Sequence, residues 1–212
     1  MAMPLGLRER KKLRTRETIA RVALDLFDRQ GFRATTIAEI AEAADVAPRT
    51  VSAYFPAKED LVFADQDEIC DALAARLDQR RPGETAIDAL RNWIVENLPA
   101  WEAREPELRT RRRVIESDDG LRNYGRRFHL RAQEIVATAI ARDLGGSPDD
   151  LEVRMAAAAT AAVLDVLGEL RDRFHEESAA TGDVSSRRDE AIALVDRALV
   201  FVGAGVRALR ER

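Results

Sequence analysis

Apolar side chains recur at spacings of three and four residues through most of this chain, the pattern of amphipathic α-helices. The clearest N-terminal example runs from Thr15 to Gln30, where Ile19 and Phe27 share one face. Gly31 follows and favours a helix end, because glycine adopts the backbone conformation that terminates helices. We therefore predict a helix over 15–30.

Two short helices are predicted next, at 37–43 and 48–54. Thr36 and Glu39 have the spacing of a capping box, in which each side chain satisfies a backbone N–H at a helix start. Pro48 suits a first helical position because its missing N–H has no partner there.

The rest of the chain is predicted to be helical as well, interrupted at prolines and glycines such as Pro99 and Gly145. The expected helices are 58–80, 84–98, 105–116, 118–144, 148–177 and 187–211. The expected fold class is all-α, with a three-helix N-terminal part and a C-terminal helical bundle.

Composition agrees with a helical protein of the cytosol. The 212 residues are 46% hydrophobic but only 5% aromatic, and the single cysteine, Cys70, cannot form an internal disulfide. The N-terminus has no apolar run of the kind that a signal peptide needs, and no window is long and apolar enough to span a membrane. We expect a cytoplasmic protein that does not contact membranes.

Charge is distributed unevenly along the chain. The net charge is −4 overall, but residues 1–58 hold eleven Arg and Lys against seven Asp and Glu, which gives this segment +4 and the remainder −8. A polyanion is therefore expected to meet the N-terminal end.

The two short helices form a helix-turn-helix. Ile37, Ile40, Val46 and Val51 can build its small core, which leaves the outer side of helix 48–54 available to a DNA major groove. Arg49 is suited to donate a bidentate pair to guanine, and hydroxyl side chains can bind base edges or phosphates.

The segment from Ala34 to Leu61, ATTIAEIAEAADVAPRTVSAYFPAKEDL, resembles the signature of the TetR family of transcription regulators. The resemblance covers about the first 61 residues at motif level, and beyond them only length, helical content and helix order. Asp45, Ala47 and Ser52 depart from the family pattern, in place of a turn glycine, a Ser or Thr cap and a frequent aromatic.

The resemblance, joined to the exposed pattern of helix 48–54, implies a set of DNA contacts. They are Arg33, Thr35, Thr36, Pro48, Arg49, Thr50, Ser52, Tyr54 and Lys58. The implied domains are a basic arm at 1–14, a helix-turn-helix domain at 15–60, and an effector-binding and dimerisation domain at 61–212. The basic arm has two open interpretations, a DNA contact or a solvated tail.

The last two helices carry apolar seams that favour a four-helix bundle between two copies of the chain. The expected dimer interface consists of Val163, Val166, Leu167, Leu170, Val195, Leu199, Val202 and Val206. Packing of these helices inside one subunit is the alternative. A second apolar seam passes through Leu194, Ala198 and Phe201, so the last helix is expected to bury two faces.

An effector pocket is expected among helices 84–98, 105–116 and 118–144. Its candidate residues are Trp93, Trp101, Arg112, Tyr124 and Phe128. Aromatic side chains and a cation suit an apolar or acyl-type molecule with an anionic group, although aromatic residues at these spacings also serve as core.

An enzyme is not expected. His129 and His175 have no metal-ligand partner at helical spacing, Cys70 has no base nearby in sequence, and no glycine-rich phosphate loop is present. We predict no cofactor, no metal and no catalytic residue. The expected function is a homodimeric, ligand-responsive repressor released from a pseudo-palindromic operator in double-stranded DNA; the alternatives are an architectural DNA-binding protein without effector, or an activator.

Overall fold

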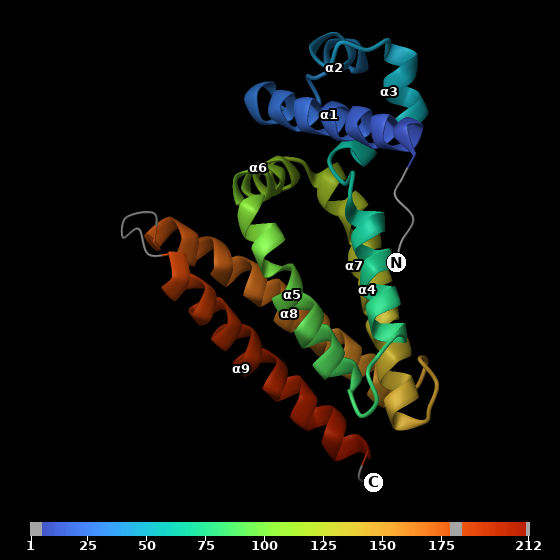
Figure 1. Cartoon of the computed structure of the whole chain (residues 1–212), viewed down its shortest axis with the longest axis vertical. Coiled ribbons are helices and arrows are strands. Elements are labelled where there is room, and N and C mark those ends of the chain that lie inside the picture. Colours follow the sequence, from blue (N-terminus) through green and yellow to red (C-terminus); the bar gives the residue numbers. More distant parts are fainter. Residues whose placement is uncertain (1–5, 179–183, 211–212) are drawn as a thin grey trace. The chain divides into compact units, whose positions relative to one another are not determined.

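The computed structural model describes residues 6–178 and 184–210. For residues 167–178 and 184–188 it describes the backbone only. Helices account for nearly all of the secondary structure in this part, as predicted (Figure 1). They are α1 (Leu7–Gln30), α2 (Ile37–Ala43), α3 (Pro48–Tyr54), the 3-10 helix η1 (Glu59–Leu61), α4 (Gln66–Asp78), α5 (Ala86–Ala103), α6 (Glu105–Glu116), α7 (Asp119–Leu144), α8 (Leu151–Ser178) and α9 (Val184–Arg210).

The largest differences from the prediction concern α1, the helix expected from Lys58, and α5. Helix α1 begins at Leu7, so the basic residues between Arg8 and Arg14 are helical and do not form a separate arm. The helix expected from Lys58 is divided into η1 and α4. Pro99 lies inside α5, whereas it was predicted to separate two helices. Proline removes only one helical hydrogen bond, and packing of the face that contains Ile94 and Leu98 keeps the helix continuous.

The helices belong to two compact units, and the division is not a single point in the sequence. The first unit combines residues 1–66 with 104–126, and the second combines 67–103 with 127–212. The division differs from the predicted boundary near residue 60, because α6 and the first turns of α7 group with the N-terminal helices.

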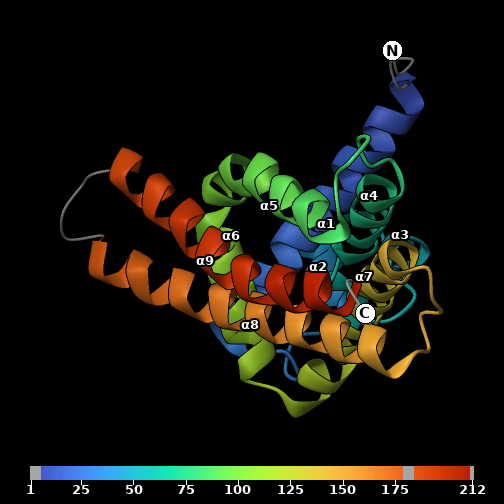
Figure 2. The same cartoon turned by 90° about the horizontal axis from the view of Figure 1, so that it is seen from below.

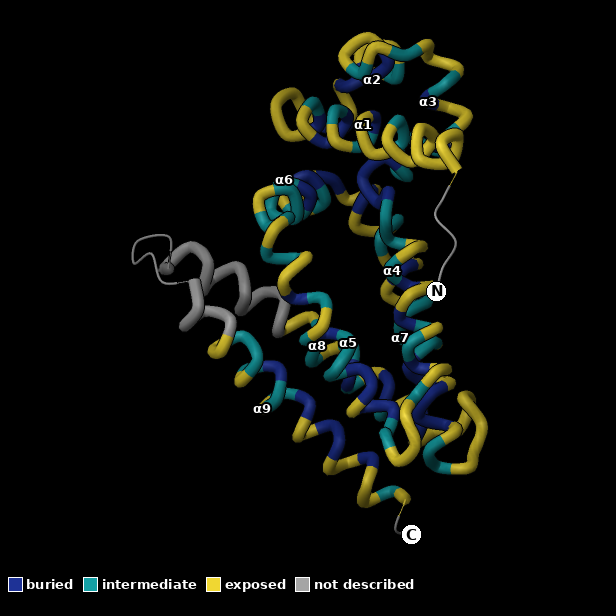
Figure 3. The backbone as a smooth tube through the Cα atoms, viewed as in Figure 1, coloured by how far each residue is buried: buried dark blue, intermediate teal, exposed yellow. Residues whose placement is uncertain are grey.

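The first unit is built around α1, which packs against α2, η1 and α6. Ile19 and Phe27 on α1 are almost fully buried, as are Ile40 on α2 and Val51 on α3. Figure 3 shows these buried stretches alternating with exposed turns along α1. The helix-turn-helix core predicted from Ile40 and Val51 is confirmed.

The second unit has a core of aliphatic side chains from its helices α4, α5 and α7–α9. Helices α8 and α9 lie side by side, and α9 also packs against α5 (Figure 2). Thr160, the one polar residue of α8 that is fully buried among those described, donates its hydroxyl hydrogen to the Ala156 carbonyl, so the core contains no unsatisfied group there. None of the described helices is long and apolar enough to cross a membrane.

Candidate nucleic-acid interface

The turn between α2 and α3 depends on Asp45. Its φ is +53°, a left-handed conformation that no other described residue except glycine adopts. Asp tolerates this region better than most residues, which explains how the chain makes the turn without the glycine of the family pattern. The N–H of Val46 then bonds to the Ala41 carbonyl at 2.9 Å and closes the turn.

Thr36 caps α2 as the sequence predicted. The backbone N–H of Glu39 donates to Thr36 Oγ1 at 3.2 Å, and the N–H of Thr36 donates to Glu39 Oε2 at 2.7 Å. These bonds from Thr36 lower the pKa of the Glu39 carboxyl. Thr36 is exposed beside the helix N-terminus, where free backbone N–H groups favour an anion.

Thr35 is placed differently from the prediction. Its side chain is buried, with only 1% of the residue exposed, and its hydroxyl donates to the Gly31 carbonyl at 2.9 Å while accepting from Gln30 Nε2. The hydroxyl therefore holds the α1–α2 connection together and does not face solvent, which corrects its assignment as a DNA contact.

Helix α3 presents a polar outer face. Pro48, Arg49 and Ser52 are exposed, while Thr50 and Tyr54 are half-buried. The inner face is held by Val51 and by Phe55 just beyond the helix end, both buried. The predicted contact residues of α3 are thus brought together on one short helix, with the apolar positions turned inward.

Lys58 does not lie on this outer face. Its Nζ donates to the Phe32 carbonyl oxygen at 2.5 Å and lies 4.6 Å from the centre of the Phe32 ring. Burial lowers the pKa of this ammonium group. In this structure the charge of Lys58 fastens the start of η1 to the segment just after α1, and its predicted DNA contact stays a prediction.

Arg33 connects the segment before α2 with the segment before α7. Its Nε donates to Asp118 Oδ2 at 2.7 Å, although 82% of the Arg33 side chain is exposed. Asp118 is buried and also accepts from the N–H groups of Gly120 and Leu121 at the start of α7. The hydrogen bond from Arg33 is the main cause of the lowered pKa of Asp118.

A second ionic cluster in the same unit was missed by the sequence analysis. Asp65 accepts from Arg104 at 2.8 Å and from Arg111 at 2.7 Å, and Arg111 also donates to Glu107. Arg111 is buried, and its Nε has no hydrogen-bond partner within the described part of the chain. No spacing signal links Asp65 to Arg111, because the two residues are 46 positions apart.

Comparison with known families supplies the remaining observation. Residues 19–64 match the model described as bacterial regulatory proteins of the tetR family, and residues 84–173 match the MftR C-terminal domain. Together these segments cover more than half of the chain. The chain belongs to the TetR family of transcription regulators.

Sequence identity to individual TetR-type relatives is either low or limited to part of the chain. TcmR of Streptomyces glaucescens is 42% identical over 40% of this chain, and the match spans only 38% of TcmR. The putative mycofactocin biosynthesis regulator MftR of Mycobacterium tuberculosis is 29% identical over 66% of this chain and 71% of its own length. The structure of Salmonella enterica GusR has the same fold, with a TM-score of 0.57, 20% identity, and coverage of 92% of this chain and 96% of GusR.

The predicted effector residues of this TetR-type chain fall in both units. Trp93 and Trp101 lie on α5 in the second unit, with ring centroids 5.4 Å apart in an edge-to-face arrangement, and Phe128 is buried in the same unit. Arg112 and Tyr124 belong to the first unit, where the Tyr124 hydroxyl donates to Asp60 Oδ1 at 2.5 Å. Tyr124 is therefore engaged in holding α7 to η1.

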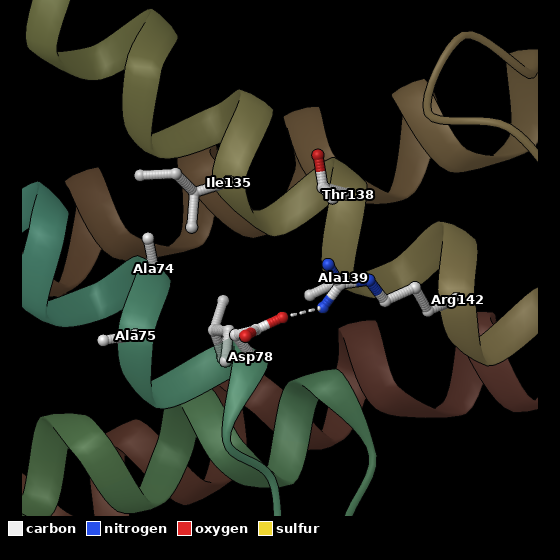
Figure 4. A pocket seen from close by; sticks show the side chains of 8 residues that line it. Ala74, Ala75, Asp78, Ile135, Thr138, Ala139 and Arg142 are labelled. Atoms are coloured by element: carbon white, nitrogen blue, oxygen red, sulfur yellow. Dashed lines mark hydrogen bonds and ion pairs between the residues drawn. The ribbon is translucent and has the colours of Figure 1, made fainter.

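A hollow of about 360 Å³ in the second unit lies between α4 and α7 (Figure 4). Its floor is made of small apolar side chains such as Ala74 and Ala139, and an ion pair between Arg142 and Asp78 crosses its edge at 2.6 Å. None of the predicted effector residues lines it.

The predicted dimer residues divide into two sets. Val195, Leu199, Val202 and Val206 are buried in the protomer's own core, where α9 packs against α5. Their assignment to a dimer interface is corrected, because side chains already enclosed by one chain cannot contact another. Val163 and Val166 line an open hollow on α8 and α9, and the side chains of Leu167 and Leu170 are outside the described set.

Proposed function

We propose that this chain is a homodimeric, ligand-responsive repressor that binds a pseudo-palindromic operator through α2 and α3. The observation that carries the proposal is the outer face of α3, where Arg49 and Ser52 are exposed while Val51 fixes the helix from behind. A short polar helix held rigidly on an apolar core is what entry into a major groove requires.

Arg49 is the residue that we propose for base recognition. It is exposed on the first turn of α3, next to Pro48, and N-terminal residues of a recognition helix are the ones that reach base edges. Its guanidinium can donate two parallel hydrogen bonds to O6 and N7 of guanine. The exposed hydroxyls of Thr36 and Ser52 are proposed to bind phosphate or base edges nearby.

Dimerisation is proposed to use the outer faces of α8 and α9. A hollow of about 520 Å³ there is lined at three- and four-residue spacing on both helices, by Ala159, Ala162, Val163 and Val166 and by Leu194, Arg197, Ala198 and Phe201. Phe201 is 73% exposed and Val166 is 51% exposed. Exposed apolar side chains at this spacing support coverage by the same face of a second copy.

Regulation is proposed to follow from the effector's different affinities for two states of the dimer. The edge-to-face pair of Trp93 and Trp101, neither of them fully buried, supports an apolar effector. Arg111, next to the candidate residue Arg112, is buried, but its charge is neutralised by Asp65 and Glu107. An apolar effector is therefore better supported than an anionic one.

The test is binding of the purified protein to the DNA immediately upstream of its own coding sequence, measured over a range of salt concentrations. Wild-type protein is expected to bind this DNA tightly. Its affinity should fall steeply as the salt concentration rises, because binding releases counterions from the DNA. Arg49→Ala should reduce the discrimination between this DNA and an unrelated duplex. The loss should be about 1–3 kcal/mol of binding free energy for the upstream DNA.

Glu42→Ala is a useful control, because Glu42 is exposed on the short helix α2 and is not a proposed contact. It should retain the wild-type discrimination between the two duplexes. A wild-type protein with no salt-dependent affinity for either duplex would refute DNA binding altogether.

A further inference from the structure

The buried guanidinium of Arg111, on α6, has one N–H group that nothing within the described part of the chain satisfies. The residue is only 7% exposed, and its Nε makes no hydrogen bond there. Buried N–H groups are nearly always paired, because an unpaired one destabilises the fold. An unpaired donor on a buried cation therefore calls for an acceptor.

The partners of Arg111 gather on one side of α6. Arg104, Glu107 and Arg111 follow one another at spacings of three and four residues, so they share a face of the helix. Asp65, in the segment between η1 and α4, accepts hydrogen bonds from both arginines. The preceding residue, Ala64, is buried, so these four charged groups meet largely shielded from water.

No carboxylate oxygen of this cluster remains for the Nε of Arg111. Oδ1 of Asp65 accepts from Arg111, and Oδ2 accepts from Arg104. Oε1 of Glu107 accepts from both arginines, and its Oε2 accepts from the Nε of Arg104 at 3.4 Å. An acceptor for the Nε of Arg111 must therefore come from outside the cluster.

The charge balance of the cluster restricts the chemistry of that acceptor. Burial alone would raise the pKa of Asp65, but the charges and hydrogen bonds of Arg111 and Arg104 hold it below its ordinary value. Two cations thus face two carboxylates, Asp65 and Glu107, and their charges cancel. A further anion would add an unbalanced charge to a largely buried site, whereas a carbonyl, ester or ether oxygen accepts a hydrogen bond without adding charge.

We propose that the Nε of Arg111 recognises one uncharged oxygen of the effector, an apolar molecule that carries a carbonyl, ester or ether group. This inference rests on the proposed function as a ligand-responsive regulator and adds a specificity-determining residue to it. The same guanidinium is bonded to Asp65, which lies four residues after the end of η1 at Leu61. The effector is thereby connected through Arg111 to the segment that leads from the helix-turn-helix into α4.

The experiment compares three probes of nearly equal size, whose affinities for the full chain are measured by equilibrium dialysis. The probe 2-acetylnaphthalene carries an uncharged acceptor, 2-naphthoate carries an anionic one, and 2-ethylnaphthalene carries none. Wild-type protein is expected to bind the ketone roughly ten- to a hundredfold more tightly than the hydrocarbon, as a hydrogen bond from a charged donor provides. It should also bind the ketone more tightly than the carboxylate.

Arg111→Lys keeps the positive charge beside Asp65 but removes the Nε donor. It should lower the affinity for the ketone to that for the hydrocarbon. Arg104→Lys is the matched control, because it makes the same change in the same cluster, where the Nε already has Glu107 as its partner. This control should keep the wild-type preference for the ketone. Circular dichroism verifies that both variants are folded.

Glu107→Gln tests the charge argument without altering the side chain of Arg111. Glutamine keeps an oxygen for the two arginines but leaves the cluster with one excess positive charge. The affinity for 2-naphthoate should therefore rise relative to that for 2-acetylnaphthalene. An unchanged ratio would refute the proposed exclusion of anions, and this arm decides the question even if Arg111→Lys does not fold.

The outcomes separate this proposal from the function on which it rests. A wild-type protein without preference for the ketone, or an Arg111→Lys variant that keeps the preference, would refute recognition by Arg111. Binding to the upstream DNA is measured beside it, with and without the ketone. If the ketone binds through Arg111 but leaves DNA affinity unchanged, the site stands and ligand-responsive repression fails. If it releases DNA equally from wild type and Arg111→Lys, the function stands and the site fails.

Discussion

Arg33 and Asp118 are joined by a hydrogen bond of 2.7 Å between Nε and Oδ2, although they are 85 positions apart in the sequence. Arg33 precedes the helix-turn-helix, and Asp118 precedes α7. The carboxylate thus serves two purposes, because its other oxygen accepts from the first free N–H groups of α7. The start of α7 is thereby linked by one hydrogen bond to Arg33, two residues before Thr35.

Asp118 is predicted to stabilise the first unit in a pH-dependent way. Its pKa in the folded protein is lowered from 3.8, chiefly by the hydrogen bond from Arg33. The contribution is therefore fully present above pH 3.8 and is lost as the pH falls through the lowered pKa. Asp118→Asn should abolish this part of the acid sensitivity while it keeps an oxygen at the start of α7.

Asp118→Ala should cost more than Asp118→Asn at neutral pH, by about 1 kcal/mol, since it also removes the helix cap. Urea unfolding of both variants near neutral pH and in acid measures the difference. Equal stability of the two variants at neutral pH would contradict the capping role.

Glu84 is predicted to control the acid stability of the second unit. It accepts from Arg76 at 2.5 Å, from Asn92 and from the Arg81 backbone, and these bonds, led by that of Arg76, lower its pKa from 4.5 to about 2. The stabilisation is complete above pH 4.5 and disappears as the pH falls toward about 2.

Glu84→Gln should destabilise the protein at neutral pH by about 2 kcal/mol, because Arg76 is left without its charged partner. It should also flatten the dependence of Tm on pH in the acid range. The matched control is Glu102→Gln. It removes a half-buried carboxylate that makes no ion pair within the described part of the chain. Identical acid profiles for Glu84→Gln and wild type would contradict the prediction.

Asp45 is predicted to be a site where glycine stabilises the fold. A residue with a side chain at φ +53° is strained relative to glycine, by roughly 1 kcal/mol. Asp45→Gly should therefore raise Tm by a few degrees, whereas Asp45→Val should lower it, because a β-branched side chain fits this region poorly. Thermal unfolding followed by circular dichroism measures both. A lower Tm for Asp45→Gly would mean that the carboxylate contributes more than the strain costs.

Phe201 and Leu199 are predicted to have opposite roles on α9. Phe201 is 73% exposed and Leu199 only 3%. Phe201→Glu should dissociate the proposed dimer while it leaves the helix content unchanged. Leu199→Ala should destabilise the protomer by about 2–5 kcal/mol through the cavity that it leaves.

Sedimentation of the two variants, with circular dichroism beside it, separates these effects. The proposed interface requires that Phe201→Glu sediments as a smaller particle than wild type. A Phe201→Glu variant that remains dimeric would place the interface elsewhere.

The fold class and most helices could be predicted from the sequence because the apolar period, the capping box at Thr36 and the stop at Gly31 are local signals. The exposed polar face of α3 followed from the same pattern. Thr35 and Lys58 could not be assigned in this way. Whether a hydroxyl or an ammonium group points outward depends on a carbonyl brought near by folding, in these cases those of Gly31 and Phe32.

The choice between the two seams of α9 also required the structure. Both seams are apolar and regularly spaced, so the pattern indicates that each is covered but not by what. The seam of Val195 and Leu199 is enclosed by the protomer, and the seam of Leu194 and Phe201 is open. Pairs distant in sequence, such as Asp65 with Arg111, have no local signal at all.

The discontinuity of the first unit limits how this protein can be cut and recombined. The ring centroids of Phe63 and Tyr124 are 5.8 Å apart, and Leu121 and Val114 are buried in the same unit. A fragment that stops after residue 66 would leave the surfaces meant for these side chains open to water. A chimera that gives another sensor this DNA specificity must therefore also carry residues 104–126, so the genetic unit of exchange is two segments rather than one.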